Sequence, residues 1–410
     1  MMVSLLCWWS GVINITMSKF TWPLMHESIS RIDKDKLIDF INKPNVRFTN
    51  GNKVKEFEYA WSKWIGAKYS VFLNSGASAN DLTMMAFSEL YGVGEIIMPP
   101  LTWVSDISSV LRSGNTPVFV DIDPNTLAID SNQIKSAINS QTKAVFLTHV
   151  LGLNGLNQNL LDLLKKENIP LIEDVCESHG ATFNGRKLGT FGLASNFSFY
   201  FAHHMTTIEG GVISTDDHNF YDVIRMMRSH GLVRESEIEN TKESYFRSFP
   251  DLNSDFIFAY AAHNMRSTEL NAVLGLSQLS RLNKNIEIRQ KNYKLFLDSL
   301  DSKIFKTDLD TEGNSNYALT LILREKSYKL RDNVESILIM KGIEYRRGMA
   351  GGGNQLRQPY IQKYNLSQKA TDFPNVEHIH FFSWYIGNNE NVAEEQIIDL
   401  CESLNRELSL

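Results

Sequence analysis

The sequence predicts an α/β fold in which a mostly parallel, helix-covered sheet is followed by a smaller α+β region. Between about residues 68 and 215, short runs of apolar and β-branched residues alternate with amphipathic helical patterns. Buried strands separated by helices are typical of a parallel sheet that is covered on both faces. After about residue 266 this alternation ends. The 410 residues, 43% hydrophobic and 21% charged, are enough for two packed lobes of an ordinary soluble protein.

The first region contains strands and helices in regular succession. Proline and aspartate clusters, such as Pro99-Pro100 and Asp121-Ile122-Asp123-Pro124, mark the ends of strands. The helices between the strands provide the crossovers that parallel neighbours need. The expected strands are Tyr69–Leu73, Glu95–Met98, Pro117–Val120, Ala144–Thr148 and Pro170–Glu173, and the expected helices are Ala77–Leu90, Trp103–Arg112, Gln133–Ile138 and Asn157–Glu167.

The second region begins with Ser267–Lys294, which we expect to be one long helix because leucine and valine recur there at helical spacing. A strand at Ala318–Leu323 and helices near Leu330–Lys341 and Val392–Leu408 complete a smaller α+β lobe. We therefore divide the chain into an N-terminal arm with a large domain, residues 17–266, and a small C-terminal domain, residues 267–410. The run Gly351-Gly352-Gly353-Asn354 is expected to be a loop.

The apolar residues 1–16 resemble a signal peptide only superficially, because they have no basic start and no evident cleavage site. They are also too short to span a bilayer. We interpret them as a non-native or disordered leader, with Met17 as the start, and a membrane-associating segment is the alternative. No other stretch is long and apolar enough to predict a membrane span.

Charge and cysteine content exclude several classes of protein. The net charge of -6 and the lack of a long basic run give no sign of nucleic-acid binding. Cys7, Cys176 and Cys401 are far apart, so neither a disulfide framework nor a zinc site is expected, and no metal site is predicted. Three cysteines are too few for a four-cysteine iron–sulfur cluster. A reduced, cytoplasmic location fits best.

Three polar or aromatic features follow the predicted strands. The turn from Asn74 to Ala79 enters a helix, and a glycine-containing turn of this kind exposes N–H groups to an anion. Asp174 follows a buried strand, where α/β sheets place groups that bind ligands. Trp103 follows another strand. Taken singly, Asp174 is equally compatible with a helix cap and Trp103 with the core.

The segment Ser198–Gly211, SFYFAHHMTTIEGG, resembles the cofactor-lysine segment of the sugar-nucleotide aminotransferase family, which is dependent on pyridoxal 5′-phosphate (PLP) and has fold type I. That family has Ser-Phe-x-x-x-Lys followed by Thr-Thr-x-Glu-Gly-Gly. Counting from either end places His203 where the lysine stands. The resemblance runs from about Phe48 to the C-terminal helix. It implies a mostly parallel seven-stranded sheet in the large domain.

The resemblance also implies a set of cofactor and substrate residues. The backbone of Gly76, Ala77 and Ser78 and the hydroxyl of Ser198 would hold the cofactor phosphate. Trp103 would stack on the pyridine ring, Asp174 would pair with its nitrogen, and Glu177 would lie near its hydroxyl, whereas Glu173 is expected to be structural. Asn264 would reach the phosphate from a partner subunit, so a homodimer with shared active sites is implied. Arg234 and Arg346 are candidates for binding the nucleotide sugar.

Histidine in place of lysine resembles the cluster-free 3-dehydratases of this family. Imidazole does not bind PLP covalently, but it moves protons, and an ordinary pKa near 6.5 suits a base at neutral pH. The resemblance implies that pyridoxamine 5′-phosphate (PMP) is held non-covalently and that the C3 hydroxyl leaves a nucleotide-linked 4-keto-6-deoxyhexose, for 3,6-dideoxyhexoses of surface polysaccharide. Glutamate would regenerate PMP. His204 competes with His203 for the catalytic role, but in an extended segment only one of them faces the cofactor.

Two other functions stay open at this point. One is a sugar aminotransferase that uses a different lysine, although Lys187 lies too far before Ser198 to replace the missing one in register. The other is a non-catalytic regulator that binds PLP or a nucleotide sugar. The sequence also leaves open whether the nucleotide is GDP, CDP or dTDP.

Overall fold

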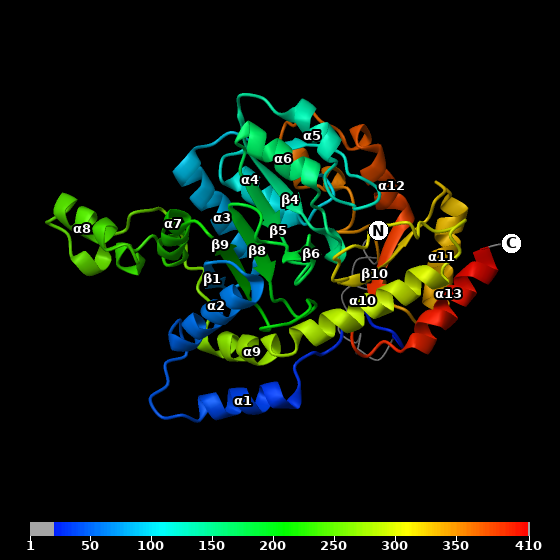
Figure 1. Cartoon of the computed structure of the whole chain (residues 1–410), viewed down its shortest axis with the longest axis horizontal. Helices are drawn as coiled ribbons and strands as arrows, with labels where there is room; N and C mark the ends of the chain where they lie inside the picture. The colour runs from blue at the N-terminus through cyan, green and yellow to red at the C-terminus, as the bar shows by residue number, and fades with distance from the viewer. Residues whose placement is uncertain (1–19, 409–410) are drawn as a thin grey trace, which may run out of the picture.

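The computed structural model describes residues 20–408, so the leader predicted at residues 1–16 lies outside the described residues. A seven-stranded sheet forms the centre of the large domain (Figure 1). In order across the sheet, the strands are β1 (Tyr69–Leu73), β9 (Gly211–Thr215), β8 (Ala194–Ser198), β5 (Leu171–Asp174), β4 (Thr142–Thr148), β2 (Glu95–Met98) and β3 (Thr116–Phe119).

Only β9 runs against its neighbours. It pairs antiparallel with both β1 and β8, whereas β8, β5, β4, β2 and β3 pair in parallel. The prediction of an α/β fold with a mostly parallel seven-stranded sheet is therefore confirmed. All five predicted strands are present, with ends that differ by no more than two residues, while β8 and β9 have no predicted counterpart.

Alternation along the strands divides the core between the two faces of the sheet. In β1, Val71 and Leu73 belong to one buried cluster and Phe72 to the other. This is the period of two that a pleated strand imposes. The first face is covered by α3 (Gly76–Tyr91), α4 (Val104–Arg112) and α7 (His218–Arg228), and the second by α2 (Asn52–Ile65), α5 (Ser131–Ala137), α6 (Gln158–Glu167) and α9 (Glu269–Leu279).

The prediction of one long helix at residues 267–294 is wrong, because the structure has two helices there. α9 ends at Leu279, and α10 (Leu282–Ser299) begins after Arg281, whose backbone is not helical. The Arg281 guanidinium forms a two-pronged ion pair with Asp33 of α1 (Arg31–Ile41), at 2.8 and 2.5 Å. The apolar spacing continues across the break, so the pattern alone gives no sign of it.

The small lobe is an antiparallel sheet with helices around it. β10 (Ala318–Ile322) and β11 (Tyr345–Arg347) both pair with β12 (Ser383–Gly387). Its remaining helices are α11 (Tyr328–Met340), α12 (Pro374–Phe382) and α13 (Glu394–Leu408). The predicted strand and both predicted C-terminal helices are present with slightly shifted ends. α10 runs from the large domain into this lobe (Figure 1).

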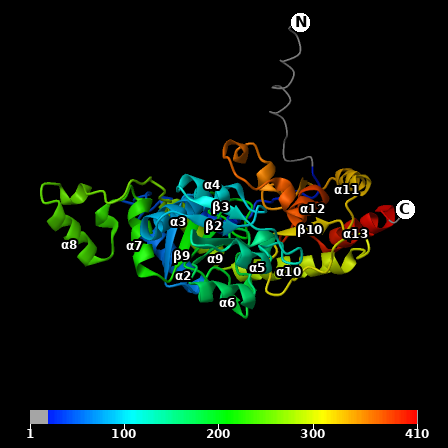
Figure 2. The same cartoon turned by 90° about the horizontal axis from the view of Figure 1, so that it is seen from above.

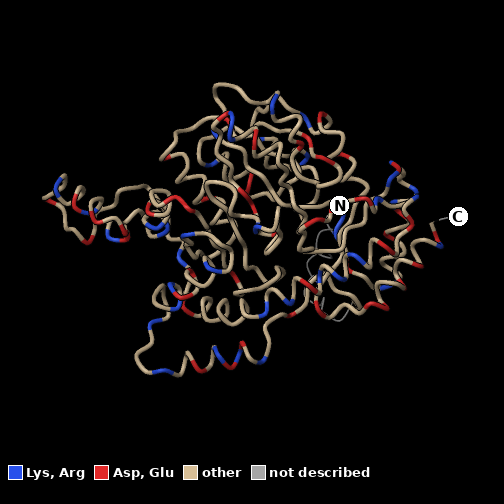
Figure 3. The backbone as a smooth tube through the Cα atoms, viewed as in Figure 1, with Lys and Arg blue, Asp and Glu red and all other residues tan. Residues whose placement is uncertain are grey.

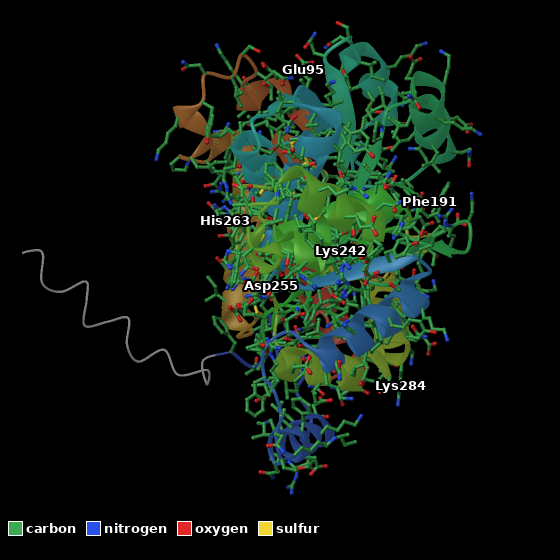
Figure 4. All side chains as sticks on the ribbon, turned by 90° about the vertical axis from the view of Figure 1, so that its left-hand side faces the viewer. Glu95, Phe191, Lys242, Asp255, His263 and Lys284 are labelled. Atoms are coloured by element: carbon green, nitrogen blue, oxygen red, sulfur yellow. The ribbon has the colours of Figure 1, made fainter. Side chains whose placement is uncertain are left out.

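A segment between α7 and α9, residues 230–264, projects from the body as an arm. It carries α8 (Glu239–Ser248), which has no buried residue. α8 stands apart from the sheet in two perpendicular views (Figures 1 and 2). Lys242 and Asp255 on the arm face the viewer in Figure 4. Basic and acidic residues are interspersed along the backbone (Figure 3), and in the described part of the chain we find no helix with the length and apolar content needed to cross a membrane.

Candidate active site

A hollow opens where β1, β4, β5 and β8 end. Residues at or just beyond the ends of these strands line it, including Thr148, Asp174 and Ser198. The cavity volume of the hollow is about 150 Å³. The carboxyl ends of parallel strands are where α/β sheets bind ligands. The predicted residues that line the hollow are Gly76, Ala77, Trp103, Asp174, Glu177, Ser198 and His203.

One side of the hollow is a cradle formed by Gly76 and Ser198. A Cβ atom at Gly76 would lie 2.5 Å from the Ser198 Cβ and 3.0 Å from its Oγ, so only glycine permits this approach. The first N–H groups of α3 have no carbonyl of their own helix to bond. That of Ser78 is capped by the Ser75 hydroxyl at 3.0 Å, and Ser78 does not line the hollow. The N–H groups of Gly76 and Ala77 beside the Ser198 hydroxyl suit a phosphate.

Asp174 provides a carboxylate within the hollow. It is 3% exposed, and it accepts hydrogen bonds from the Cys176 N–H at 2.8 Å and from Asn80 Nδ2 at 3.1 Å. Its neighbour Glu173 has a different environment, because the N–H groups of Gly189, Phe191 and Gly192 all donate to it. Glu173 is therefore structural, whereas Asp174 is placed to meet a ligand.

Trp103 lies beside the hollow rather than in the core. Its side chain is 47% exposed. The glycine loop of the small lobe packs against it, since a Cβ at Gly351 would lie 2.8 Å from Trp103 Cε3. An indole held in this way offers a flat face to an aromatic ring, which is the arrangement that stacking requires.

The segment that carries His203 and His204 is a turn rather than the extended segment that the sequence analysis assumes. The His203 N–H donates to the Tyr200 carbonyl at 3.0 Å. His203 lines the hollow, whereas His204 is 2% exposed and its Nε2 contacts the Ser315 carbonyl at 3.1 Å. The argument from strand alternation is wrong for this segment, but of the two histidines only His203 lines the hollow.

The pKa of His203 differs from the ordinary value near 6.5 that the sequence predicts. Burial, and then the positive charge of Arg289, lower it to about 3. Arg289 is 4% exposed, and its guanidinium donates to the carbonyls of Tyr317 and Asn388 rather than to a carboxylate. His203 is therefore neutral at pH 7, the form that accepts a proton. Its Nδ1 is buried without a hydrogen-bond partner in the protein.

Glu177 is a second titratable group in the hollow. Burial raises its pKa to about 7, although the hydrogen bond from the Leu151 N–H, 2.9 Å from Oε2, opposes the rise. The carboxyl group is therefore about half protonated near neutral pH, so it can either donate or accept a hydrogen bond toward a ligand.

Besides Ser78 and His204, three further predicted residues do not line the hollow of their own chain. Arg234 is exposed, with Nη1 3.3 Å from the Asp255 carbonyl. Arg346 is exposed on β11, with Nη2 3.0 Å from Glu344 Oε1. Asn264 is also exposed, and its Oδ1 accepts the Arg266 N–H at 3.2 Å. Arg234 and Asn264 lie near the two ends of the arm.

Sequence reasoning missed several residues that line the hollow. His149 directly follows β4, so the argument that identified Asp174 at the end of β5 could have found it. Tyr317 and Tyr385 come from the small lobe, and no local pattern shows that this lobe folds back over the hollow. Tyr200 lies inside the Ser198–Gly211 segment but has no counterpart in the quoted motif.

Comparison with known proteins gives matches over almost the whole chain. Residues 33–405 match the model of the DegT/DnrJ/EryC1/StrS aminotransferase family. GDP-4-keto-6-deoxy-D-mannose 3-dehydratase of Escherichia coli O55:H7 is 32% identical over 404 residues, covering 96% of this chain and 100% of the relative. The E. coli enzyme with bound hydrated PLP superposes with a TM-score of 0.85 at 30% identity, over 94% of this chain and 99% of that one. A second structure of this dehydratase, with a trapped PLP–glutamate geminal diamine, has a TM-score of 0.84 at 29% identity, over 93% and 100% of the two chains.

Replacing Glu177 with glutamine should flatten the dependence of stability on pH. Because the folded-state pKa, about 7, is above the ordinary 4.5, the contribution of Glu177 is fully present below about pH 4.5 and is lost as pH rises through 7. The loss in the free energy of unfolding is up to about 3 kcal/mol. Denaturant unfolding of the cofactor-free protein at pH 5 and pH 8 measures it. An equal drop between these pH values in wild type and Glu177→Gln would contradict the assignment.

Proposed function

The chain belongs to the DegT/DnrJ/EryC1/StrS aminotransferase family, and from this premise we propose that it is a PLP/PMP-dependent 3-dehydratase of a nucleotide-linked 4-keto-6-deoxyhexose. The product class would be the precursors of 3,6-dideoxyhexoses for surface polysaccharide. Similarity to GDP-4-keto-6-deoxy-D-mannose 3-dehydratase over the full length favours a GDP-linked substrate and L-glutamate as the amino donor.

One observation carries the proposal. His203 lines the hollow at the position of the family's lysine, and no lysine is among the described residues that line it. Lys187, the alternative weighed from the sequence, is bonded to the Trp64 carbonyl, with Nζ 4.7 Å from the centre of the Trp64 ring. The aminotransferase alternative therefore has no amine in this part of the site. The groups that would bind the cofactor are retained, which argues against a non-catalytic regulator.

The residues of the hollow fit the cofactor. Gly76, Ala77 and Ser198 would hold its phosphate, and Trp103 would cover its ring. Asp174 would keep the ring nitrogen protonated through an opposite charge. Bound PMP supplies an amine that condenses with the C4 ketone and a ring that accepts electrons.

His203 performs the proton transfers in this proposal. Its neutral imidazole would accept a proton from the cofactor's C4′ carbon, and the imidazolium would then give a proton to the hydroxyl that leaves C3. Arg289 disfavours the imidazolium, so the proton is readily passed on. Without lysine, no side-chain amine competes for the cofactor. The C3–O bond would therefore break before a proton is returned to sugar C4 to complete an amination.

The arm supports a dimer in which each subunit completes the site of the other. Four large apolar side chains, Phe249, Leu252, Phe256 and Phe258, are 45–59% exposed within ten residues of the arm, and apolar side chains gathered on a surface often mark an interaction site. Arg234 and Asn264 lie near its ends, outside the hollow of their own chain. An arm that crosses to a second copy would bury the apolar side chains and bring these two polar residues to the partner's cofactor and substrate.

Substituting His203 should separate its role from that of His204. His203→Asn should lower kcat by about 10²–10⁴-fold, the usual contribution of a general base, and His203→Lys should shift the product toward a 4-amino sugar. His204→Gln is the matched control and should keep dehydration as the main reaction. Product analysis by NMR after incubation with the GDP-linked 4-keto sugar and glutamate measures this. Loss of dehydration in His204→Gln but not in His203→Asn would contradict the assignment of His203 as the base.

Mixing two inactive variants tests the shared site. His203→Asn and Asn264→Ala, unfolded and refolded together, should recover roughly a quarter of wild-type activity, because half of the dimers are mixed and each mixed dimer has one intact site. Each variant refolded alone is the control. No recovery from a mixture that size-exclusion chromatography shows to be dimeric would mean that Asn264 does not act across subunits.

A further inference from the structure

A second carboxyl group, Asp106 of α4, lies next to Asp174 and has no part in the chemistry described above. It is fully buried. Asn80 Nδ2 links the two groups by donating to Asp106 Oδ1 at 2.7 Å and to Asp174 Oδ2 at 3.1 Å. Asp106 Oδ2 contacts the hydroxyls of Thr102 and Thr148, which are both buried.

The contacts around Asp106 Oδ2 show where a proton must be. Thr148 Oγ1 lies 2.8 Å from Asp106 Oδ2, Thr102 Oγ1 lies 2.6 Å from Thr148 Oγ1, and Thr102 Oγ1 also bonds Asp106 Oδ2. The three oxygens therefore form a closed triangle of hydrogen-bond contacts. Each contact needs one proton, and two threonines supply only two. If Asp106 is ionised, one contact places lone pairs against each other, whereas a protonated Asp106 completes the ring.

The charges around the pair favour the same assignment. Two adjacent buried carboxylates do not both ionise unless a cation compensates them. The charge that acts most strongly on Asp106 is that of Asp174, and its hydrogen bonds come from the neutral side chains of Asn80, Thr102 and Thr148. Burial, and then the charge of Asp174, raise the pKa of Asp106 well above its ordinary value.

We propose that Asp106 is a positioning residue that remains protonated at neutral pH, so that Asp174 alone carries the negative charge of the pair. The closed ring of hydrogen bonds with Thr102 and Thr148 fixes the position of Asp106. Asn80, which donates to both carboxyl groups, then holds Asp174 in a fixed position relative to Asp106. This rests on the proposed function, because it assigns Asp174 to a cationic ligand group. The protonation state itself is a property of the cofactor-free protein, so its test is independent of turnover.

Infrared spectroscopy of the cofactor-free protein at pH 7 in D₂O tests the proposal. A protonated carboxyl has a C=O stretch that is separate from carboxylate bands. Glu177 is itself about half protonated at pH 7 and adds to this band, so the comparison is made in the Glu177→Gln background. There the band should be present, and the added Asp106→Asn substitution should remove it. Asp222→Asn is the control, since Asp222 is a buried carboxylate that accepts from the Ser236 hydroxyl and the Glu237 N–H. A band of unchanged intensity after Asp106→Asn in the Glu177→Gln background would overturn the assignment.

Thermal unfolding provides a second readout. The raised folded-state pKa makes the contribution of Asp106 greatest below about pH 4, and it declines as pH rises toward that pKa. The Tm of wild type should therefore fall more steeply between pH 5 and 8 than the Tm of Asp106→Asn.

Asparagine mimics the protonated group, so Asp106→Asn should bind PLP within about threefold of wild type. Asp106→Leu should bind PLP at least about tenfold more weakly because the hydrogen bonds are lost. Equal slopes, or equal PLP affinities in the asparagine and leucine variants, would contradict a protonated positioning role.

Discussion

The site depends on the convergence of strand ends at one edge of a parallel sheet. β1, β4, β5 and β8 all run in the same direction, so their carboxyl ends bring Gly76, Thr148, Asp174 and Ser198 to a single hollow. The antiparallel β9 lies between β8 and β1, so its carboxyl end is at the opposite edge of the sheet from the hollow. Strand pairing fixes the backbone of Asp174 and Ser198, and Gly76 follows the end of β1 at the start of α3.

Electrostatics divides this hollow into two parts with different tasks. At the end of β5, the proposed protonation of Asp106 leaves Asp174 as the carboxylate that would bind a positively charged ligand group. At the turn after β8, burial and Arg289 keep His203 neutral. In the proposed function, Asp174 would favour a cation at one end of the cofactor ring and His203 would offer a neutral base at the other. Proton abstraction into an electron-accepting ring requires this separation.

Most of the large domain could be predicted because strand burial and helix periodicity are local. Asp174, Ser198 and His203 could be predicted from the sequence for the same reason, because each lies in a short motif. The break at Arg281 could not be predicted, because it depends on Asp33 in a distant helix. The pKa of His203 depends on Arg289 of α10, and the presence of Tyr317 and Tyr385 in the hollow depends on how the small lobe folds back, so no local pattern reveals either.

The most direct test of the central claim is the fate of nitrogen and oxygen in a single incubation. Purified protein is given PLP, L-glutamate and the GDP-linked 4-keto-6-deoxymannose, and free ammonia and the sugar product are quantified together. If His203 acts as a base in a site without lysine, one ammonia is released for each sugar consumed, and the sugar loses its C3 oxygen. A product that keeps the C3 hydroxyl and carries the glutamate nitrogen at C4 would contradict this mechanism.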